Sequence, residues 1–362
     1  MLFTLQIVPK LPPAIDGLGD YALNLARKLR QNFGIETHFI VGDPQWVGEN
    51  CIEGFPVSQV STHSAQTLLT LLSNTHSATV LLHYVGYGYA KRGCPNWLVE
   101  GLYRWRFGVG DLDRRLIVMF HELYAFSPPW RSSFWLSPTQ RHLAARLAQM
   151  SDRCLTSLQR YAEILEKFSQ GKHAKISTIP VFSNIGESKQ GLPLADRHRR
   201  LVVFGQQRNR LEVYQKSWAD LSHTCRILGI EEIWDIGPSL NLTLPTIDGV
   251  SILKKGECSA RDVSSVLSNS LAGFFNYYDP TRLAKSTIYA AYCAHGVLPI
   301  SPCFSSSPVD GIEPGKHYWI PKNQTTELAS LRALQAIADN AYAWYQTHNL
   351  SLQAKVFSTY LN

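Results

Sequence analysis

The stretches ATVLLHYV at residues 78–85 and LIVMF at residues 116–120 decide the fold class. Apart from Thr79 and His83, both are continuous apolar runs of strand length. They lack the alternation of polar and apolar residues that marks a strand with one face in water. Such runs are typical of strands buried on both faces, as in a parallel sheet covered by helices on both sides. They therefore predict an α/β fold with a parallel sheet at its centre.

Strands and helices alternate on either side of these two runs. A first strand is expected at residues 2–8. The helix after it, at residues 19–31, places Tyr21, Leu25 and Leu29 on one apolar face. The alternation continues with a strand at 36–41, a helix at 138–150, a strand at 153–156 and a helix at 158–168. This order is typical of a doubly wound parallel sheet.

The alternation stops in a polar stretch and then restarts. Residues 183–200 (SNIGESKQGLPLADRHRR) show no period and carry two Gly and one Pro, which is typical of a linker. Beyond it we expect strands at 201–204, 233–236, 250–253, 271–275 and 297–300, helices at 211–228, 260–268 and 283–295, and a helical tail at 326–361. The sequence thus predicts two Rossmann-like domains, at 1–183 and 201–342, joined by a linker at 184–200. A C-terminal helix at about 343–362 is expected to pack back on the first domain.

The composition argues against several classes of protein. With 45% hydrophobic and 17% charged residues, the chain can bury a sizeable core. Its 7 cysteines are scattered without a CxxC pair, which indicates reduced thiols rather than disulfides or a zinc site. No run reaches the ~18–20 apolar residues that span a bilayer, and the N-terminus lacks the features of a signal peptide. We therefore expect a cytoplasmic protein.

The net charge of +7 is mild for this length. It suits an anionic small ligand such as a nucleotide diphosphate, or contact with the cytoplasmic face of an anionic membrane. The sequence carries no basic stripe and no nucleic-acid-binding motif, so no nucleic-acid partner is expected. It also carries no HExxH, GxSxG or P-loop motif.

The loop after the first strand, PAIDGLGDYALNLA, is one candidate ligand site. Gly17 and Gly19 flank the start of a helix, where exposed N–H groups favour an anion. A tight turn between strand and helix explains the two glycines equally well. The pattern is not GxGxxG followed by a ribose-binding acid, which argues against a NAD site.

Further segments, in the same order along the chain, resemble the retaining glycosyltransferases of the GT-B fold, family 4 type. Besides this glycine loop they are FHELYA (120–125), MSDRCLTSLQRYAEIL (150–165), ISTIPVFSN (176–184), LVVFGQQRNR (201–210) and AYCAHGVLPI (291–300). The resemblance implies two Rossmann-like domains that face each other across a cleft. It also implies transfer of a sugar, with retention, from a nucleotide-sugar donor to a hydroxyl of a glycan, lipid or small-molecule acceptor. No metal and no further cofactor would be required.

The resemblance also implies roles for single residues. His121, which follows a buried strand, would be the catalytic residue near the transferred sugar, although a lone His is about as often structural. His83 and Tyr87 would line the acceptor site. Arg208 and Arg210 would clamp the donor diphosphate, since a guanidinium binds phosphate oxygens with two parallel hydrogen bonds. Gly17 and Gly19 are also assigned to the donor site.

The segment at residues 276–296 departs from the family. The family has two acidic residues here, eight positions apart, but this chain has Leu283 and Ala291 at those positions. Asp279 is the acidic residue that remains and could replace one of them, while Lys285 and Ser286 could hold phosphate near a helix start. The missing pair keeps two alternatives open: a catalytically silent protein that binds a nucleotide sugar or a partner transferase, and a nucleotide-sugar epimerase.

Overall fold

The computed structural model describes the whole chain except residues 1, 76, 109–112, 127–128, 189–191, 245, 248, 278, 322–329 and 362. It divides into two compact units. The first unit comprises Met1–Pro180 together with Leu350–Asn362, and the second comprises Val181–Asn349. Each is a parallel α/β unit, so the predicted fold class is confirmed. No helix among the described residues is long and apolar enough to cross a membrane.

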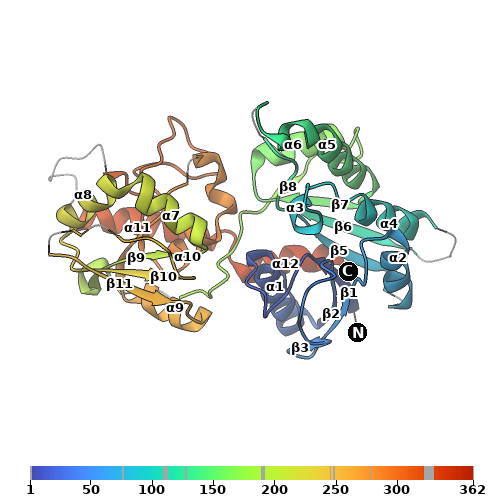
Figure 1. The fold of residues 1–362 in the computed structure, drawn as a ribbon, viewed down its shortest axis with the longest axis horizontal. Helices are drawn as coiled ribbons and strands as arrows, with labels where there is room; N and C mark the ends of the chain where they lie inside the picture. The colour runs from blue at the N-terminus through green and yellow to red at the C-terminus, as the bar shows by residue number, and fades with distance from the viewer. Residues whose placement is uncertain are drawn as a thin grey trace. The chain divides into compact units, whose positions relative to one another are not determined.

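The first unit is built on an eight-stranded sheet with the order β3-β4-β2-β1-β5-β6-β7-β8 (Figure 1). All of its strand pairs are parallel except the short antiparallel pair β3–β4. The chain adds strands to one side of β1 and then, from β5 on, to the other. The strands are β1 (Leu2–Val8), β2 (Ile35–Val41), β3 (Cys51–Ile52), β4 (Phe55–Gln59), β5 (Thr79–Tyr84), β6 (Arg115–Phe120), β7 (Arg153–Thr156) and β8 (Ser177–Thr178).

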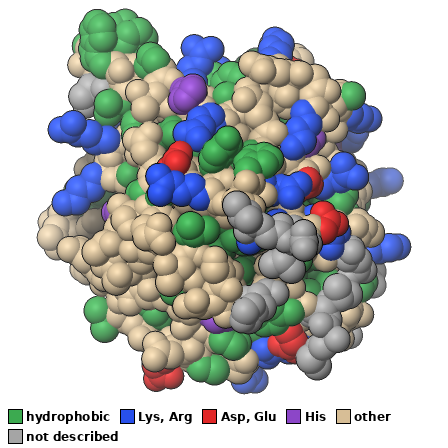
Figure 2. All heavy atoms as spheres, turned by 90° about the vertical axis from the view of Figure 1, so that its right-hand side faces the viewer, with side chains coloured by type: hydrophobic (Ala, Val, Ile, Leu, Met, Phe, Trp, Pro, Cys, Tyr) green, Lys and Arg blue, Asp and Glu red, His purple; other side chains and the backbone are tan. Residues whose placement is uncertain are grey.

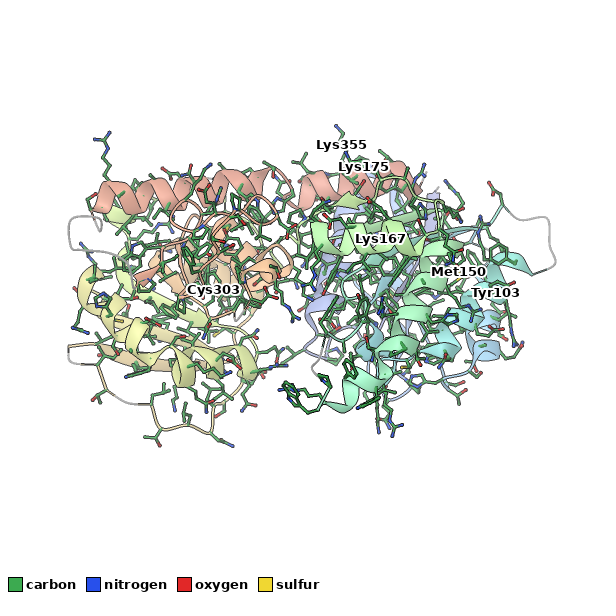
Figure 3. The ribbon with its side chains drawn as sticks, turned by 90° about the horizontal axis from the view of Figure 1, so that it is seen from above. Tyr103, Met150, Lys167, Lys175, Cys303 and Lys355 are labelled. Atoms are coloured by element: carbon green, nitrogen blue, oxygen red, sulfur yellow. The ribbon has the colours of Figure 1, made fainter. Side chains whose placement is uncertain are left out.

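The helices of the first unit are α1 (Gly17–Phe33), α2 (Ala65–Asn74), α3 (Gly86–Tyr89), α4 (Asn96–Phe107), α5 (Ser132–Met150), α6 (Gln159–Phe168) and α12 (Leu350–Leu361). The last of them packs against the first, and the Tyr21 hydroxyl donates to Gln353 Oε1 over 2.7 Å. Lys355 in Figure 3 marks α12, and near the end of this helix the Tyr360 hydroxyl lies 3.5 Å from Ser177 Oγ on β8. The C-terminal helix therefore belongs to the first unit.

The second unit contains a five-stranded parallel sheet with the order β11-β10-β9-β12-β13. The chain again adds strands to one side of its first strand, β9, and then to the other. The strands are β9 (His198–Phe204), β10 (Glu232–Ile236), β11 (Ser251–Gly256), β12 (Ser270–Phe274) and β13 (Leu298–Ile300). The helices are the 3-10 helices η1 (Leu194–Asp196) and η2 (Pro280–Lys285), together with α7 (Gln207–Lys216), α8 (Trp218–Leu228), α9 (Ala260–Ser268), α10 (Thr287–Ala294) and α11 (Leu331–Gln346).

Several predicted elements differ in detail. The segment predicted as a linker contains η1 and the start of β9, because Leu194 is buried in the core of the second unit. The helix predicted at 211–228 is two helices that meet at Ser217. The helix predicted at 283–295 begins only at Thr287, where the Ser286 hydroxyl accepts a hydrogen bond from the Tyr289 N–H and caps α10. The tail is two helices, and residues 326–329 lie outside the described part.

Candidate functional site

The candidate site of the first unit lies at the carboxyl edge of its sheet. In doubly wound sheets, ligands bind at this edge where the strand order reverses, which here is between β1 and β5. His83 is the second-to-last residue of β5, and His121 follows the last residue of the neighbouring strand β6. Parallel pairing of the two strands therefore places the two imidazoles next to each other.

A chain of hydrogen bonds runs through these imidazoles into the sheet. His83 Nδ1 lies 3.2 Å from His121 Nε2, and His83 Nε2 lies 3.0 Å from Gln6 Oε1. Gln6 Nε2 in turn donates to Thr37 Oγ1 over 3.3 Å. The side chains of Gln6, His83 and Thr37 are completely buried, whereas His121 is partly exposed. Burial lowers the pKa of His83 to about 3, so this imidazole is neutral near pH 7.

Tyr21 on α1 holds both imidazoles in place. The edge contact between its ring and that of His121 has a centroid distance of 5.1 Å, and the contact with His83 has one of 5.7 Å. Both pairs are close to perpendicular, the arrangement that aromatic rings prefer. His121 is thus fixed by two neighbours and remains the predicted catalytic residue. The role predicted for His83 does not fit, because an imidazole with no exposed surface and both nitrogens bonded cannot line an acceptor site.

Tyr87 on α3 follows β5 at the same edge of the sheet. Its side chain is 44% exposed, and its hydroxyl accepts a hydrogen bond from Gln140 Nε2 over 3.1 Å. An aromatic ring held at one end and open to solvent can stack on a sugar ring. The acceptor-binding role of Tyr87 stays a prediction.

The glycine loop before α1 carries negative charge in the structure. Asp16 Oδ2 accepts a hydrogen bond from the Gly19 N–H over 3.1 Å, and Asp20 lies in the first turn of α1. A Cβ at Gly19 would lie 2.4 Å from the Lys10 carbonyl oxygen, so this glycine is needed for packing. The two carboxylates oppose binding of an anion, which weakens the donor-binding role predicted for Gly17 and Gly19.

In the second unit the strand order reverses between β9 and β12, and two glycines shape the adjoining loops. Gly205 after β9 has a φ of 122°, and Gly237 after β10 has a φ of 143°. A Cβ at Gly237 would lie 2.3 Å from the Gly205 carbonyl oxygen. The loops approach so closely that only glycine fits.

Arg210, predicted to clamp a diphosphate, is instead a buried structural residue. Its side chain is 2% exposed and forms an ion pair with Asp235, which is 1% exposed. The guanidinium also donates to the carbonyl oxygens of Gly205 and Pro238. A buried guanidinium committed to these partners holds the two glycine loops together and cannot also bind phosphate. Arg208, two residues earlier, is exposed on the first turn of α7, and its donor-binding role stays a prediction.

The start of α10 lies against the same loops. A Cβ at Gly205 would lie 2.7 Å from Ile288 Cδ1, in the first turn of α10. Lys285 and Ser286 come directly before this helix, and its first turn carries no acidic residue. The first turn of α10 therefore meets the loop after β9 at the carboxyl edge, and N–H groups at the start of a helix favour a phosphate.

Asp279 caps η2 in the structure. Its Oδ1 accepts hydrogen bonds from the Thr281 N–H over 3.0 Å and from the Thr281 hydroxyl over 2.5 Å. The two positions where the family has acidic residues, Leu283 and Ala291, are each 1% exposed. Both side chains therefore pack in the interior of the second unit. The catalytic role of Asp279 stays a prediction.

Sequence reasoning missed Gln6, Tyr21 and Asp20. A signal for Gln6 was present, because Gln6 and His83 are each flanked by apolar residues on both sides within their strands. Burial, followed by repulsion from Asp16, raises the pKa of Asp20 to about 6.

No group of three or more His, Cys, Asp or Glu side chains that could hold a metal ion occurs in the part of the chain that the structure describes.

The chain matches no protein-family model and no curated protein sequence. Solved structures do match. An alpha-glucosyltransferase (AGT) in complex with UDP is 9% identical with a TM-score of 0.62, and 99% of each chain is covered. WaaG, a glycosyltransferase involved in lipopolysaccharide biosynthesis, is 11% identical with a TM-score of 0.60 over 99% of each chain. A putative UDP-N-acetylglucosamine 2-epimerase from Listeria monocytogenes is 14% identical with a TM-score of 0.57, covering 99% of this chain and 95% of the other.

At these identities the likeness shows the fold alone, and it confirms the predicted GT-B architecture of two Rossmann-like domains. It does not show a family within that fold. The alpha-glucosyltransferase has also been solved in complex with UDP-glucose and DNA. The expectation that nucleic acid plays no part therefore has no support from the structural neighbours.

The burial of Arg210 predicts a large effect on stability. Changing Arg210 to Ala leaves the Asp235 carboxylate buried without its cation, which costs about 3–5 kcal/mol of the free energy of unfolding. The exposed Arg208→Ala variant is the matched control and should change that free energy by less than about 0.5 kcal/mol. Urea unfolding measures both. Equal effects of the two substitutions would contradict the structural role of Arg210.

Asp20 predicts a pH dependence of stability. Its pKa is about 6 in the folded chain and near 3.8 in the unfolded chain, so the folded state binds more protons between these values. The contribution of Asp20 to stability therefore falls as the pH rises from about 4 through 6. We expect Asp20→Asn to have a higher free energy of unfolding than the wild type at pH 8, and this gain should be smaller at pH 4. The exposed Asp196→Asn is the control. A gain independent of pH would contradict this.

Proposed function

We propose that this protein is a glycosyltransferase that transfers a sugar from a nucleotide-sugar donor to a hydroxyl of an acceptor. The second unit binds the donor and the first unit binds the acceptor. The observation that carries the proposal is the start of α10, which lies against the loop after β9 where the second sheet reverses its strand order. The structural neighbours solved with UDP or UDP-glucose support it.

The donor diphosphate needs positive charge, because negative charge builds up on it as the glycosidic bond breaks. The N–H groups at the start of α10, the Lys285 ammonium group and the Arg208 guanidinium supply this charge without a metal ion. A cavity of about 240 Å³ at the ends of β10 and β11 is the proposed place for the base. Its lining includes Ser239, Leu240 and Lys254 together with the Arg210–Asp235 pair.

On the acceptor side, His121 is the proposed catalytic residue and Tyr87 the proposed stacking surface. In the reaction, the bond between the anomeric carbon and the diphosphate oxygen breaks. The departing nucleoside diphosphate keeps the electron pair of that bond. A bond from the anomeric carbon to the acceptor oxygen forms, and the hydroxyl proton passes to the departing diphosphate. Retention of configuration, as the family 4 resemblance implies, is part of the proposal. A hexose is the sugar class that we propose.

The donor site predicts a selective loss of affinity. We expect the double variant Arg208→Ala/Lys285→Ala to weaken binding of the preferred nucleotide sugar by about 10- to 100-fold, since each charge-assisted hydrogen bond to phosphate contributes about 1.5–3 kcal/mol before neighbours compensate. Thermal-shift screening with UDP-, GDP- and ADP-sugars identifies the donor, and calorimetry measures its Kd. Lys216→Ala on the last turn of α7, where the side chain pairs with Glu212, is the control. Unchanged affinity in the double variant would contradict the site.

An epimerase is the second candidate, favoured by the epimerase among the structural neighbours and by the absent acidic pair. Incubating the donor without an acceptor separates the alternatives. An isomerised nucleotide sugar indicates an epimerase, and slow hydrolysis indicates a transferase. Tight binding without any turnover indicates a catalytically silent protein.

Aromatic side chains on the first unit support membrane contact on the cytoplasmic face. Trp130 is 83% exposed and Trp135 is 73% exposed, and Arg131 between them is exposed as well. Tryptophan beside basic residues suits the interface of an anionic bilayer. Figure 2 shows Lys and Arg side chains spread widely over one face of the molecule. We propose an anionic lipid surface as the partner and a lipid-linked molecule as the favoured acceptor.

Membrane contact predicts that vesicle binding depends on the two tryptophans. We expect Trp130→Ser/Trp135→Ser to lower the partition coefficient on phosphatidylglycerol-containing vesicles by about tenfold or more, because apolar area and charge both contribute to such binding. Leu352→Ser, which removes an exposed apolar side chain from α12, is the control. Cosedimentation measures the partition. Equal binding by both variants would contradict the proposed surface.

A further inference from the structure

Two polar side chains stand in the middle of the first sheet, where the fold does not need them. Gln6 on β1 and His83 on β5 have no exposed surface, and their strand neighbours Leu5, Ile7 and Leu82 are apolar and buried. Burying a polar group costs about 1–3 kcal/mol unless it is hydrogen-bonded. An apolar pair would fill these positions at lower cost, so the two side chains call for an explanation beyond packing.

The hydrogen bonds that join Gln6, His83 and His121 have a direction. Gln6 Nε2 donates to Thr37 Oγ1, which leaves Gln6 Oε1 to face His83. A carbonyl oxygen can only accept, so His83 Nε2 must carry the proton. A neutral imidazole has one N–H, and His83 Nδ1 is therefore an acceptor. His121 Nε2, 3.2 Å away, must then be the donor.

We propose that Gln6 and His83 are positioning residues that hold His121 as the Nε2–H tautomer, so that His121 uses Nδ1 to accept a hydrogen bond from a substrate hydroxyl. The tautomer follows from the hydrogen bonds alone, and only the nature of the ligand rests on the proposed function. Gln6 and His83 touch no substrate. They act through His121, and the edge contacts of Tyr21 fix the plane of its ring.

The low pKa of His83 supports this arrangement. Because burial holds that pKa at about 3, His83 does not take a second proton near neutral pH and stays an acceptor towards His121. A doubly protonated His83 would repel the Nε2–H of His121 and reverse the direction of the chain. Burial makes these polar side chains costly for stability. The same burial keeps His83 neutral, so the direction of the hydrogen bonds from His121 to Gln6 stays constant.

The test uses two readouts. In the full-length chain labelled with ¹⁵N-histidine, NMR spectra based on two-bond ¹H–¹⁵N couplings report which ring nitrogen carries the proton. We expect Nε2–H for both His83 and His121. Nδ1–H on His121 would overturn the proposal, because it would mean that the Gln6 amide has the opposite orientation. This result does not depend on any activity, so it separates failure of the inference from failure of the proposed function.

Variants of Gln6 give the second readout. Gln6→Met keeps the side-chain length but removes the acceptor, and we expect a mixture of His121 tautomers and a fall in kcat of about 10- to 100-fold with little change in KM. Thr4→Val is the control, since it removes another buried hydrogen bond of the same sheet, from Thr4 Oγ1 to the Thr79 carbonyl. A single unchanged tautomer in Gln6→Met would overturn the proposal, and if that variant does not fold the wild-type spectrum still decides.

Discussion

The parallel pairing of β1 with both β2 and β5 is the interaction on which the first unit depends. It places Gln6 between Thr37 on β2 and His83 on β5, so that three neighbouring strands carry one hydrogen-bonded polar chain. The pairing of β5 with β6 extends the chain to His121 at the carboxyl edge. A slip of register in any of these pairs would leave buried polar groups without partners. The polar chain and the register of the sheet therefore stabilise each other.

The second unit repeats the topology but assembles its site differently. Its central strand β9 ends in Gly205, and the loop that follows is held to the loop after β10 by the Arg210–Asp235 pair. The close approach of Gly205 to Gly237 leaves no room for side chains between the loops. The proposed donor site of this unit lies at the start of α10, which contacts the loop after β9 through Ile288. In this unit one arginine has a structural role and its near neighbour is open to solvent.

Much of the fold could be predicted because a doubly buried strand leaves a clear mark in the sequence. The runs at 78–85 and 116–120 gave the parallel sheet, and His121 could be placed at its carboxyl edge by counting to the end of a strand. Arg210 could not be separated from Arg208 in the same way. Both follow a strand, and what distinguishes them is Asp235, 25 residues further along the chain. Helix breaks at Ser217 and Ser286 were also missed, because a serine is common both inside helices and at their caps.

The contrast between Arg210 and the Gln6–His83 pair shows how a buried polar group is to be interpreted. Arg210 meets its partners within its own loops, where its hydrogen bonds end on two backbone carbonyls and on the Asp235 carboxylate. The Gln6–His83 chain continues instead to a partly exposed imidazole. The hydrogen bonds of Arg210 hold the loops after β9 and β10 together. A chain that leads from the core to a side chain at the ligand-binding edge can act on what binds there, which is why we assign a structural role to the first and a positioning role to the second.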